Sequence, residues 1–233
     1  MNWLLLNSGP DDAAFNMALD EALLEAMRRL QQPVLRFYGW TERAASFGYF
    51  QKFAEVGRAT RLRPLVRRPT GGGLVPHDAD WTYSLVFPPG HEWHGLKAVE
   101  SYRRVHGWIQ EAFQKLRMET ELARFKKSAA HNPQSEAAGR CFIGHEQFDL
   151  LRHGKKIAGA AQRRNRLGLL IQGSVQPPSG SPGRADWERA MCEVARSQWG
   201  GGWSEFAPDA ALLARTRALA HQKYSQPGYN EKR

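Results

Sequence analysis

Cys141 and Lys156 are the two side chains in this sequence whose setting favours covalent chemistry. Cys141 follows Arg140 and precedes Lys155 and Lys156, and a basic neighbourhood favours the reactive thiolate over the thiol. A cysteine in that form can act as a nucleophile and carry an acyl group as a thioester. The alternative is a cysteine that is merely buried and inert. For Cys192, which falls near the apolar face of a predicted helix, we expect only a structural role.

Lys156 begins the run Lys156-Ile157-Ala158-Gly159-Ala160, whose other members are typical of a buried strand. A buried ammonium group needs a charged partner or a chemical task. The alternative is a lysine at the end of a strand that reaches solvent. Gly159 and the alanines after it indicate that something large packs against this strand, either a ligand chain or another strand.

A triple glycine, Gly71, Gly72 and Gly73, follows Arg68 and Thr70. Glycine loses more conformational freedom on folding than any other residue, so three in a row point to positive φ angles or to backbone that lies against a ligand. We therefore expect a strand, a glycine turn that lines a pocket, and a return strand over residues 81–87. The spacing excludes a phosphate-binding P-loop. A flexible surface loop is the alternative, and His77 after the turn could hold the loop through a backbone hydrogen bond or transfer protons.

The spacing of apolar residues predicts a mixed succession of helices and strands. We expect helices up to residue 30 and over 98–116, 187–199 and 208–223, strands over 34–38, 44–50, 81–87 and 167–175, and a hairpin that turns at 153–154. Residues 126–139 offer little to bury and predict a loop. Because no linker or repeat divides the chain, we expect one α+β domain over residues 1–225, with mixed, mainly antiparallel sheets flanked by helices, and a frayed tail over 226–233.

The chain has 233 residues and a net charge of +10, which calls for an acidic partner. Nucleic acid is the commonest such partner, but we find no helix-turn-helix, zinc or RNP motif, and an acidic protein fits equally well. The first residues predict neither a signal peptide nor a membrane span. Two cysteines are too few for a disulfide framework, so we expect a cytoplasmic protein. No spacing of histidines, cysteines and carboxylates predicts a metal site.

Two blocks of the sequence together resemble the signature of the lipoate–protein ligase and octanoyltransferase superfamily, whose members share the biotin/lipoate ligase fold. The blocks are Arg-Arg-Pro-Thr-Gly-Gly-Gly-Leu-Val-Pro-His-Asp at 67–78 and Gly-Lys-Lys-Ile-Ala-Gly-Ala-Ala-Gln-Arg-Arg at 154–164. Further similarities lie at 16–21, 37–51, 172–174 and 223–224. The resemblance implies that fold, with mainly antiparallel sheets, over nearly the whole chain.

Two chemistries occur in this superfamily. Octanoyltransferases move an octanoyl group from acyl carrier protein, through a cysteine thioester, to a lysine of a lipoyl domain or of the glycine cleavage carrier protein, without a cofactor. Lipoate ligases instead use ATP, with magnesium, to activate free lipoate as an adenylate. The pair Cys141-Phe142 ahead of the Lys-Ile-Ala-Gly block resembles the octanoyltransferase type whose cysteine lies before that block. The ATP-dependent ligase is the alternative.

The resemblance implies Cys141 and Lys156 as catalytic residues and a set of residues that bind the acyl chain. That set is Arg68, Thr70, Gly71, Gly72, Gly73, His77, Gly159, Ala160, Gln172 and Gly173. Gln172 stands where relatives of this type usually have histidine, at the rim of the expected acyl pocket. We expect a monomer that binds neither nucleic acid nor membranes. A third hypothesis is a non-catalytic module that binds carrier proteins or nucleic acid. We find no DNA-binding segment in the sequence, so this hypothesis would need tight sequence-specific binding to support it.

Overall fold

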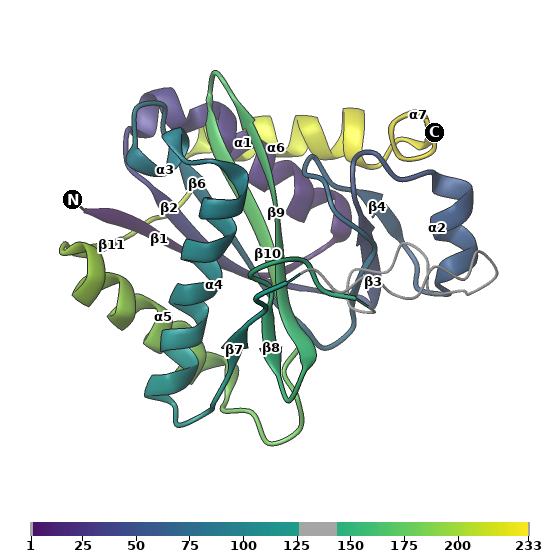
Figure 1. Cartoon of the computed structure of the whole chain (residues 1–233). Helices are drawn as coiled ribbons and strands as arrows, with labels where there is room; N and C mark the ends of the chain where they lie inside the picture. The colour runs from purple at the N-terminus through teal and green to yellow at the C-terminus, as the bar shows by residue number, and fades with distance from the viewer. Residues whose placement is uncertain (1, 126–143, 233) are drawn as a thin grey trace.

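A mixed β-sheet runs through the centre of the molecule (Figure 1). The structure, a computed structural model, describes residues 2–125 and 144–232, and within these ranges this sheet has eight strands. Two strand pairs, β1–β2 and β1–β11, are parallel, and the other pairs are antiparallel. The strand order is β11 (Trp203–Glu205), β1 (Trp3–Asp11), β2 (Val34–Trp40), β6 (Trp81–Phe87), β10 (Gly168–Val175), β9 (Lys155–Asn165), β8 (Leu150–Arg152) and β7 (Glu121–Leu122). The expected α+β class with mainly antiparallel sheets is confirmed.

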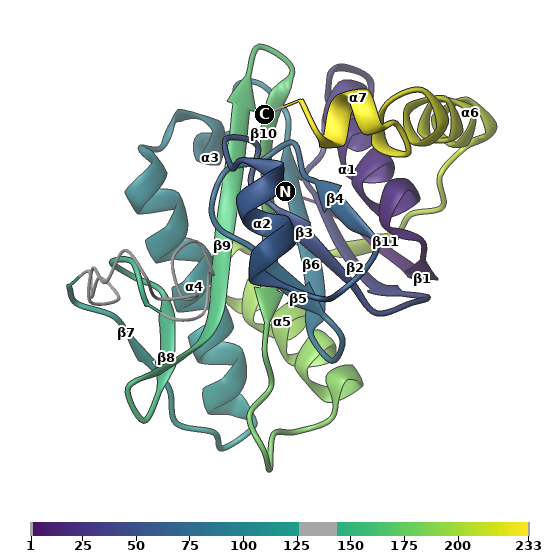
Figure 2. The same cartoon turned by 90° about the vertical axis from the view of Figure 1, so that its right-hand side faces the viewer.

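Helices cover both faces of this sheet (Figures 1 and 2). On one face α4 (Ala98–Lys115), preceded by the short α3 (Glu92–Gly95), packs beside α5 (Arg184–Trp199) over an aromatic core. On the other face α1 (Ala13–Leu30) packs against α6 (Ala210–Leu219) and the π-helix η1 (Ala220–Tyr224) over a second, mainly aliphatic core. The predicted helices therefore exist, with starts shifted by a few residues. The last of them begins at Ala210 rather than Pro208, because the side chain of Asp209 accepts from the backbone N–H of Leu212 and caps the helix.

A second, smaller sheet lies beside the α1 face, with α2 (Phe53–Ala59) next to it (Figure 2). Its strand order is β4 (Leu65–Arg67), β3 (Ala44–Phe47) and β5 (Val75–His77). The expected link from a strand through the glycines to a return strand over 81–87 is wrong in detail. The glycines instead carry the chain across β3, which separates β4 from β5, and β6 follows only after β5.

The strands of the large sheet carry unlike side chains on their two faces. In β6, Trp81, Tyr83, Leu85 and Phe87 belong to the aromatic core under α4 and α5. The alternate residues Thr82 and Ser84 turn towards α1 and the small sheet, where they donate hydrogen bonds to buried carboxylates. Because side chains alternate along a strand, one face of β6 supplies packing and the other supplies a polar lining.

The chain end does not fray as expected. A short helix, α7 (Pro227–Asn230), packs against β4, and the backbone N–H of Arg67 donates to Asn230 Oδ1 at 2.8 Å. The guanidinium of Arg67, which is buried, donates to the main-chain oxygens of Tyr229 and Asn230. A buried arginine needs acceptors on all sides, and the tail supplies some of them. No helix in the described ranges is long and apolar enough to cross a membrane.

Candidate active site

A narrow cavity, which we call the slot, opens between β9 and β10 of the large sheet and the small sheet, and has a volume of about 40 Å³. Met17 of α1 and Tyr38 of β2 contribute apolar parts of its lining. The predicted binding residues that line the slot are Arg68, Gly72, His77, Gly159, Ala160, Gln172 and Gly173. Residues of both sequence blocks thus meet at the slot, whereas Thr70, Gly71 and Gly73 are not among its lining residues. Neither block indicated Met17 or Tyr38.

The glycine loop is held in shape by Arg68. The Arg68 guanidinium donates to the carbonyl oxygens of Gly71 (2.7 Å) and Gly73 (2.6 Å). Gly72 has φ +83°, a conformation that favours glycine, and a Cβ there would lie 3.0 Å from Arg68 Nη2. A Cβ on Gly48, just after β3, would lie only 1.9 Å from the Gly72 carbonyl oxygen. The loop therefore rests directly on the backbone that follows β3. Gly48 falls within the segment 37–51 noted for its similarity, although no role in the site was predicted for it.

Gln172 is fixed from both sides of the slot. Its Oε1 accepts from the Thr70 hydroxyl at 2.7 Å, and its Nε2 donates to Asp20 Oδ2 at 2.7 Å. Behind it, Asp20 forms an ion pair with Arg36 at 2.7 Å, and both side chains are fully buried. Thr70 thus acts through Gln172 rather than by lining the slot. Because each of these groups has a partner, this wall is both polar and rigid.

Lys156 folds back over its own strand and meets Asp149. Lys156 Nζ lies 2.6 Å from Asp149 Oδ2, and the two side chains are only 5% and 7% exposed. A Cβ on Gly159 would lie 2.7 Å from Lys156 Cε and 2.8 Å from Nζ. The large group predicted to pack against Gly159 is therefore the lysine side chain itself. The prediction of a buried lysine with a charged partner is confirmed, and the partner is an aspartate within the apolar run Phe148-Asp149-Leu150-Leu151.

A buried neutral histidine stands beside this ion pair. His106 of α4 is 1% exposed, and its Nδ1 donates to the carbonyl oxygen of Phe148 at 2.7 Å. Burial lowers the pKa of His106 to about 4, with the nearby Lys156 lowering and Asp149 raising it. The imidazole is therefore uncharged at neutral pH, so Asp149 has Lys156 as its positive neighbour rather than His106.

His77 closes the slot on the small-sheet side through two side-chain hydrogen bonds. Its Nδ1 lies 2.9 Å from Asp80 Oδ2, and its Nε2 lies 2.8 Å from Ser46 Oγ. Burial raises the pKa of Asp80, but His77 and the hydroxyls of Ser174 and Thr82 outweigh it, so the net pKa lies below its ordinary value. The expectation that a backbone hydrogen bond holds the loop differs from the structure, since both ring nitrogens meet side chains.

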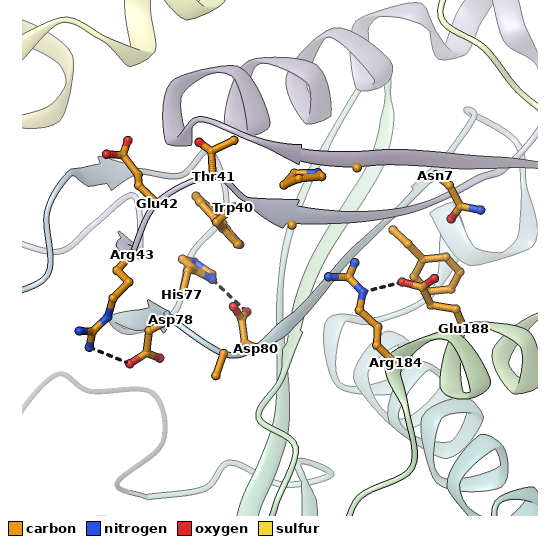
Figure 3. A pocket seen from close by; sticks show the side chains of 15 residues that line it. Asn7, Trp40, Thr41, Glu42, Arg43, His77, Asp78, Asp80, Arg184 and Glu188 are labelled. Atoms are coloured by element: carbon orange, nitrogen blue, oxygen red, sulfur yellow. Dashed lines mark hydrogen bonds and ion pairs between the residues drawn. The ribbon is translucent and has the colours of Figure 1, made fainter.

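A broader cleft of about 550 Å³ shares His77 with the slot (Figure 3). Its charged side chains are largely paired with one another: Arg43 with Asp78 at 3.3 Å, and Arg184 with Glu188 at 2.7 Å. The ring of Trp40 in its wall stacks on the His77 imidazole at 3.8 Å. In the described parts of the chain, no group of three histidines, cysteines or carboxylates could hold a metal ion. The cleft therefore borders the His77 ring through Trp40.

Cys141 and the predicted loop over 126–139 lie outside the described residues. Cys192, within α5, is a free cysteine. Burial raises the pKa of the Cys192 thiol to about 12, which keeps it protonated at neutral pH. This agrees with the structural role expected for it, since an unreactive thiol is the rule for a cysteine in apolar surroundings.

Comparison with known proteins places this geometry in a family. Residues 12–176 match the family described as lipoyl protein ligase A/B catalytic domain. The octanoyltransferase LipM of Halalkalibacterium halodurans is 37% identical over 182 residues, which cover 74% of this chain and 65% of that protein. The octanoyltransferase LipM of Bacillus subtilis is 35% identical over 183 residues, with 74% and 64% covered. The chain thus spans about two thirds of the length of these curated relatives.

Solved structures share the fold across the whole chain. A putative lipoate protein ligase from Thermoplasma acidophilum with bound lipoic acid has a TM-score of 0.78 at 19% identity, covering all of both chains. A lipoate-protein ligase A bound with ATP has a TM-score of 0.78 at 20% identity, covering 99% of each. At such low identity these likenesses concern the fold alone. From the match over 12–176, this chain belongs to the lipoyl protein ligase A/B catalytic domain family.

Proposed function

We propose that this protein is an octanoyltransferase. Cys141 takes an octanoyl group from acyl carrier protein as a thioester, and the ε-amine of a lysine on a lipoyl domain or on the glycine cleavage carrier protein then takes it as an amide. Each half of the reaction passes through a tetrahedral oxyanion, which one preorganised site can stabilise. The route uses no ATP, metal ion or other cofactor. The names of relatives that are 34–39% identical support this reaction class.

The observation that carries the proposal is the slot together with the buried cation beside it. The β9 wall of the slot includes Gly159, Ala160 and Ala161, so this strand brings no bulky side chain to the lining. Each methylene buried there contributes roughly 0.8 kcal/mol, so a slot of fixed length discriminates between acyl chains a few carbons apart. Met17 and Tyr38 supply apolar surface for the same chain.

Lys156 is the group that we propose for the reacting end of the chain. Its ammonium is buried and held by Asp149 against the strand that lines the slot. A fixed positive charge stabilises both a cysteine thiolate and the oxyanion that develops on the acyl carbon. Loss of one such contact lowers rates by roughly 10² to 10³. We therefore assign Lys156 a catalytic role together with Cys141.

The test is acyl loading of the full chain, followed by intact-mass spectrometry. The protein is mixed with octanoyl acyl carrier protein, and a lipoyl domain is then added. We expect an octanoyl adduct on the wild type and on Cys192→Ala, none on Cys141→Ala, and transfer of the adduct to the lipoyl domain. A parallel reaction contains free lipoate, ATP and magnesium.

Two outcomes would contradict the proposal. One is a Cys141→Ala protein that still modifies the lipoyl domain at the wild-type rate when given lipoate and ATP, which would identify a ligase. The other is a wild type that forms no adduct at all with the octanoyl donor while it remains folded by circular dichroism.

A further inference from the structure

His77 has no nitrogen left with which to act directly on a substrate. Its Nδ1 is engaged by Asp80 and its Nε2 by Ser46, at 2.9 and 2.8 Å. Any proton that His77 accepts must therefore come through the Ser46 hydroxyl. The Ser46 hydroxyl, which no part of the proposed transfer reaction uses, is therefore the atom of this group that faces a substrate.

The Asp80 carboxylate determines which atoms donate in the hydrogen bonds of His77. Asp80 Oδ2 also accepts from the hydroxyls of Thr82 (2.9 Å) and Ser174 (2.7 Å), which leaves it the acceptor towards His77. His77 then carries its proton on Nδ1 and presents a lone pair at Nε2. Ser46 must donate its hydroxyl proton to that lone pair. This is the ground state of a nucleophile, a base and an acid that orients the base.

The surroundings favour attack by the Ser46 oxygen. Arg68 Nη1 donates to Ser46 Oγ at 3.1 Å, so a cation already faces the atom on which negative charge would develop. The Trp40 ring, stacked on the imidazole at an angle of 16°, holds the base in one orientation. Ser46 is 3% exposed, yet Ser46, His77 and Arg68 all line the slot. A molecule reaches the hydroxyl by occupying that slot.

We propose that Ser46 is a second nucleophile of the slot, activated by His77 and Asp80, and that it hydrolyses medium-chain acyl thioesters and esters. The proposal rests on the proposed function in one respect, that an acyl chain occupies the slot. It adds an activity, hydrolysis, and a substrate class, small activated acyl compounds that need no carrier protein.

Hydrolysis proceeds through an ester on Ser46. Ser46 Oγ bonds to the acyl carbon while its proton moves to His77 Nε2, and the carbon–sulfur bond of the thioester breaks. His77 returns that proton to the leaving sulfur, which departs as a free thiol. Water then attacks the Ser46 ester and gives a proton to His77, the ester bond breaks, and His77 restores the Ser46 hydroxyl as the carboxylic acid leaves.

The experiment uses the full chain with Cys141→Ala, so that the proposed transfer nucleophile is absent. The probe is the octanoyl thioester of N-acetylcysteamine, and the readouts are release of free thiol and mapping of the octanoyl adduct by mass spectrometry. We expect slow thiol release and an adduct on the peptide that contains Ser46. That adduct should resist neutral hydroxylamine, because it is an oxygen ester and not a thioester.

Four further variants separate chemistry from folding. Ser46→Ala should lower thiol release at least 100-fold, and Asp80→Asn by a similar or larger factor, since loss of the orienting acid leaves the base in the wrong tautomer. Ser46→Cys keeps a hydrogen-bonding side chain and a nucleophile, and its adduct should become cleavable by hydroxylamine. Ser204→Ala, on the edge strand β11, is the matched control and should behave like its Cys141→Ala parent.

The outcomes distinguish this proposal from the proposed function. If the wild type loads Cys141 with octanoyl but Cys141→Ala releases no thiol, or releases it equally with Ser46→Ala, the role of Ser46 is overturned and the transferase stands. If acyl carrier protein loads nothing but the small thioester still labels Ser46, the role of Ser46 stands and the transferase fails. Labelling of any other residue in place of Ser46 also overturns the inference.

Discussion

Lys156 Nζ lies 2.6 Å from Asp149 Oδ2, in a pair that is almost wholly shielded from solvent. Asp149 Oδ2 also accepts from the backbone N–H of Glu146 at 2.7 Å, so the carboxylate is itself fixed. Removal of one partner from a buried ion pair leaves the other charge buried and uncompensated. The loss of stability then exceeds the stability that the intact pair contributes. Asp149 is thus a positioning residue for Lys156.

Asp149→Asn should lower kcat for octanoyl transfer about 10- to 100-fold, as loss of a supporting partner does in other sites. KM for the donor should change little, because Asp149 itself does not line the slot. Steady-state kinetics with octanoyl acyl carrier protein provide the measurement. The control is Glu193→Gln, which breaks the exposed Lys115–Glu193 pair at 3.1 Å and should cost less than about 0.5 kcal/mol with no change in rate. A raised KM with unchanged kcat would argue against the positioning role.

Two glycines of the slot should respond differently to alanine. In Gly159→Ala the new Cβ meets only the end of the Lys156 side chain, which can shift while it stays near Asp149, so we expect a loss of activity with a smaller loss of stability. In Gly173→Ala it would lie 2.1 to 2.4 Å from the ring of Tyr83, which is fully buried, so we expect about 2 kcal/mol or more of destabilisation from overpacking. Urea unfolding and transfer assays on both variants test this contrast. Equal destabilisation of the two would contradict it.

His106 should make stability depend on pH. The pKa of His106 is about 4 in the folded chain, whereas the ordinary value for histidine is 6.5. Between these two pH values His106 is protonated in the unfolded chain but not in the folded one. Stability is then lost as the pH falls from 6.5 towards 4, by about 3 kcal/mol at most. In His106→Asn, whose amide nitrogen can still donate to Phe148, this part of the loss should vanish. Urea midpoints at pH 7 and pH 4.5 measure this loss of stability. The control is His153→Asn at an exposed position, where asparagine suits the positive φ of 49°; its stability should change between the two pH values as in the wild type.

The C-terminal segment should contribute to stability through Arg67. A chain that ends at Gln226 loses the acceptors that Tyr229 and Asn230 offer to the Arg67 guanidinium. We expect a loss of about 3 kcal/mol in the free energy of unfolding, the usual consequence of breaking a buried charged network. A chain that ends at Glu231 keeps those acceptors and serves as the control. Equal stability of the two truncated chains in chemical denaturation would show that the tail is dispensable.

Salt should weaken the use of protein substrates but not of small ones. With a net charge of +10, the protein attracts an acidic carrier over distances that salt screens. We expect KM for octanoyl acyl carrier protein to rise several-fold between 50 and 300 mM salt, on the order expected for steered association. KM for octanoyl N-acetylcysteamine, which is uncharged, should stay constant. If KM for octanoyl acyl carrier protein does not change with salt, the positive charge of the protein does not serve to attract the carrier.

The helices and strands were predictable from the sequence because each leaves a local periodic pattern. The helix of α1 and the hairpin of β8 and β9 arise from neighbours along the chain, and the structure has both. The sequence also predicted that Gly72 and Lys156 matter to the site. A residue type that is unusual for its setting indicates a structural or functional requirement, even when the requirement itself is unknown. The family resemblance then linked the two blocks that meet at the slot.

The partners of these residues were decided only by the tertiary structure. The space beside Gly159 holds the Lys156 side chain, β3 lies between β4 and β5, and the C-terminal segment packs on Arg67. Each of these depends on which distant segments pack together, and local periodicity carries no information about that. The same reason explains why the Ser46–His77–Asp80 alignment was not predicted. Asp80 follows His77 closely in the sequence, but Ser46 comes within hydrogen-bonding distance of His77 only because β3 pairs with β5 in the small sheet.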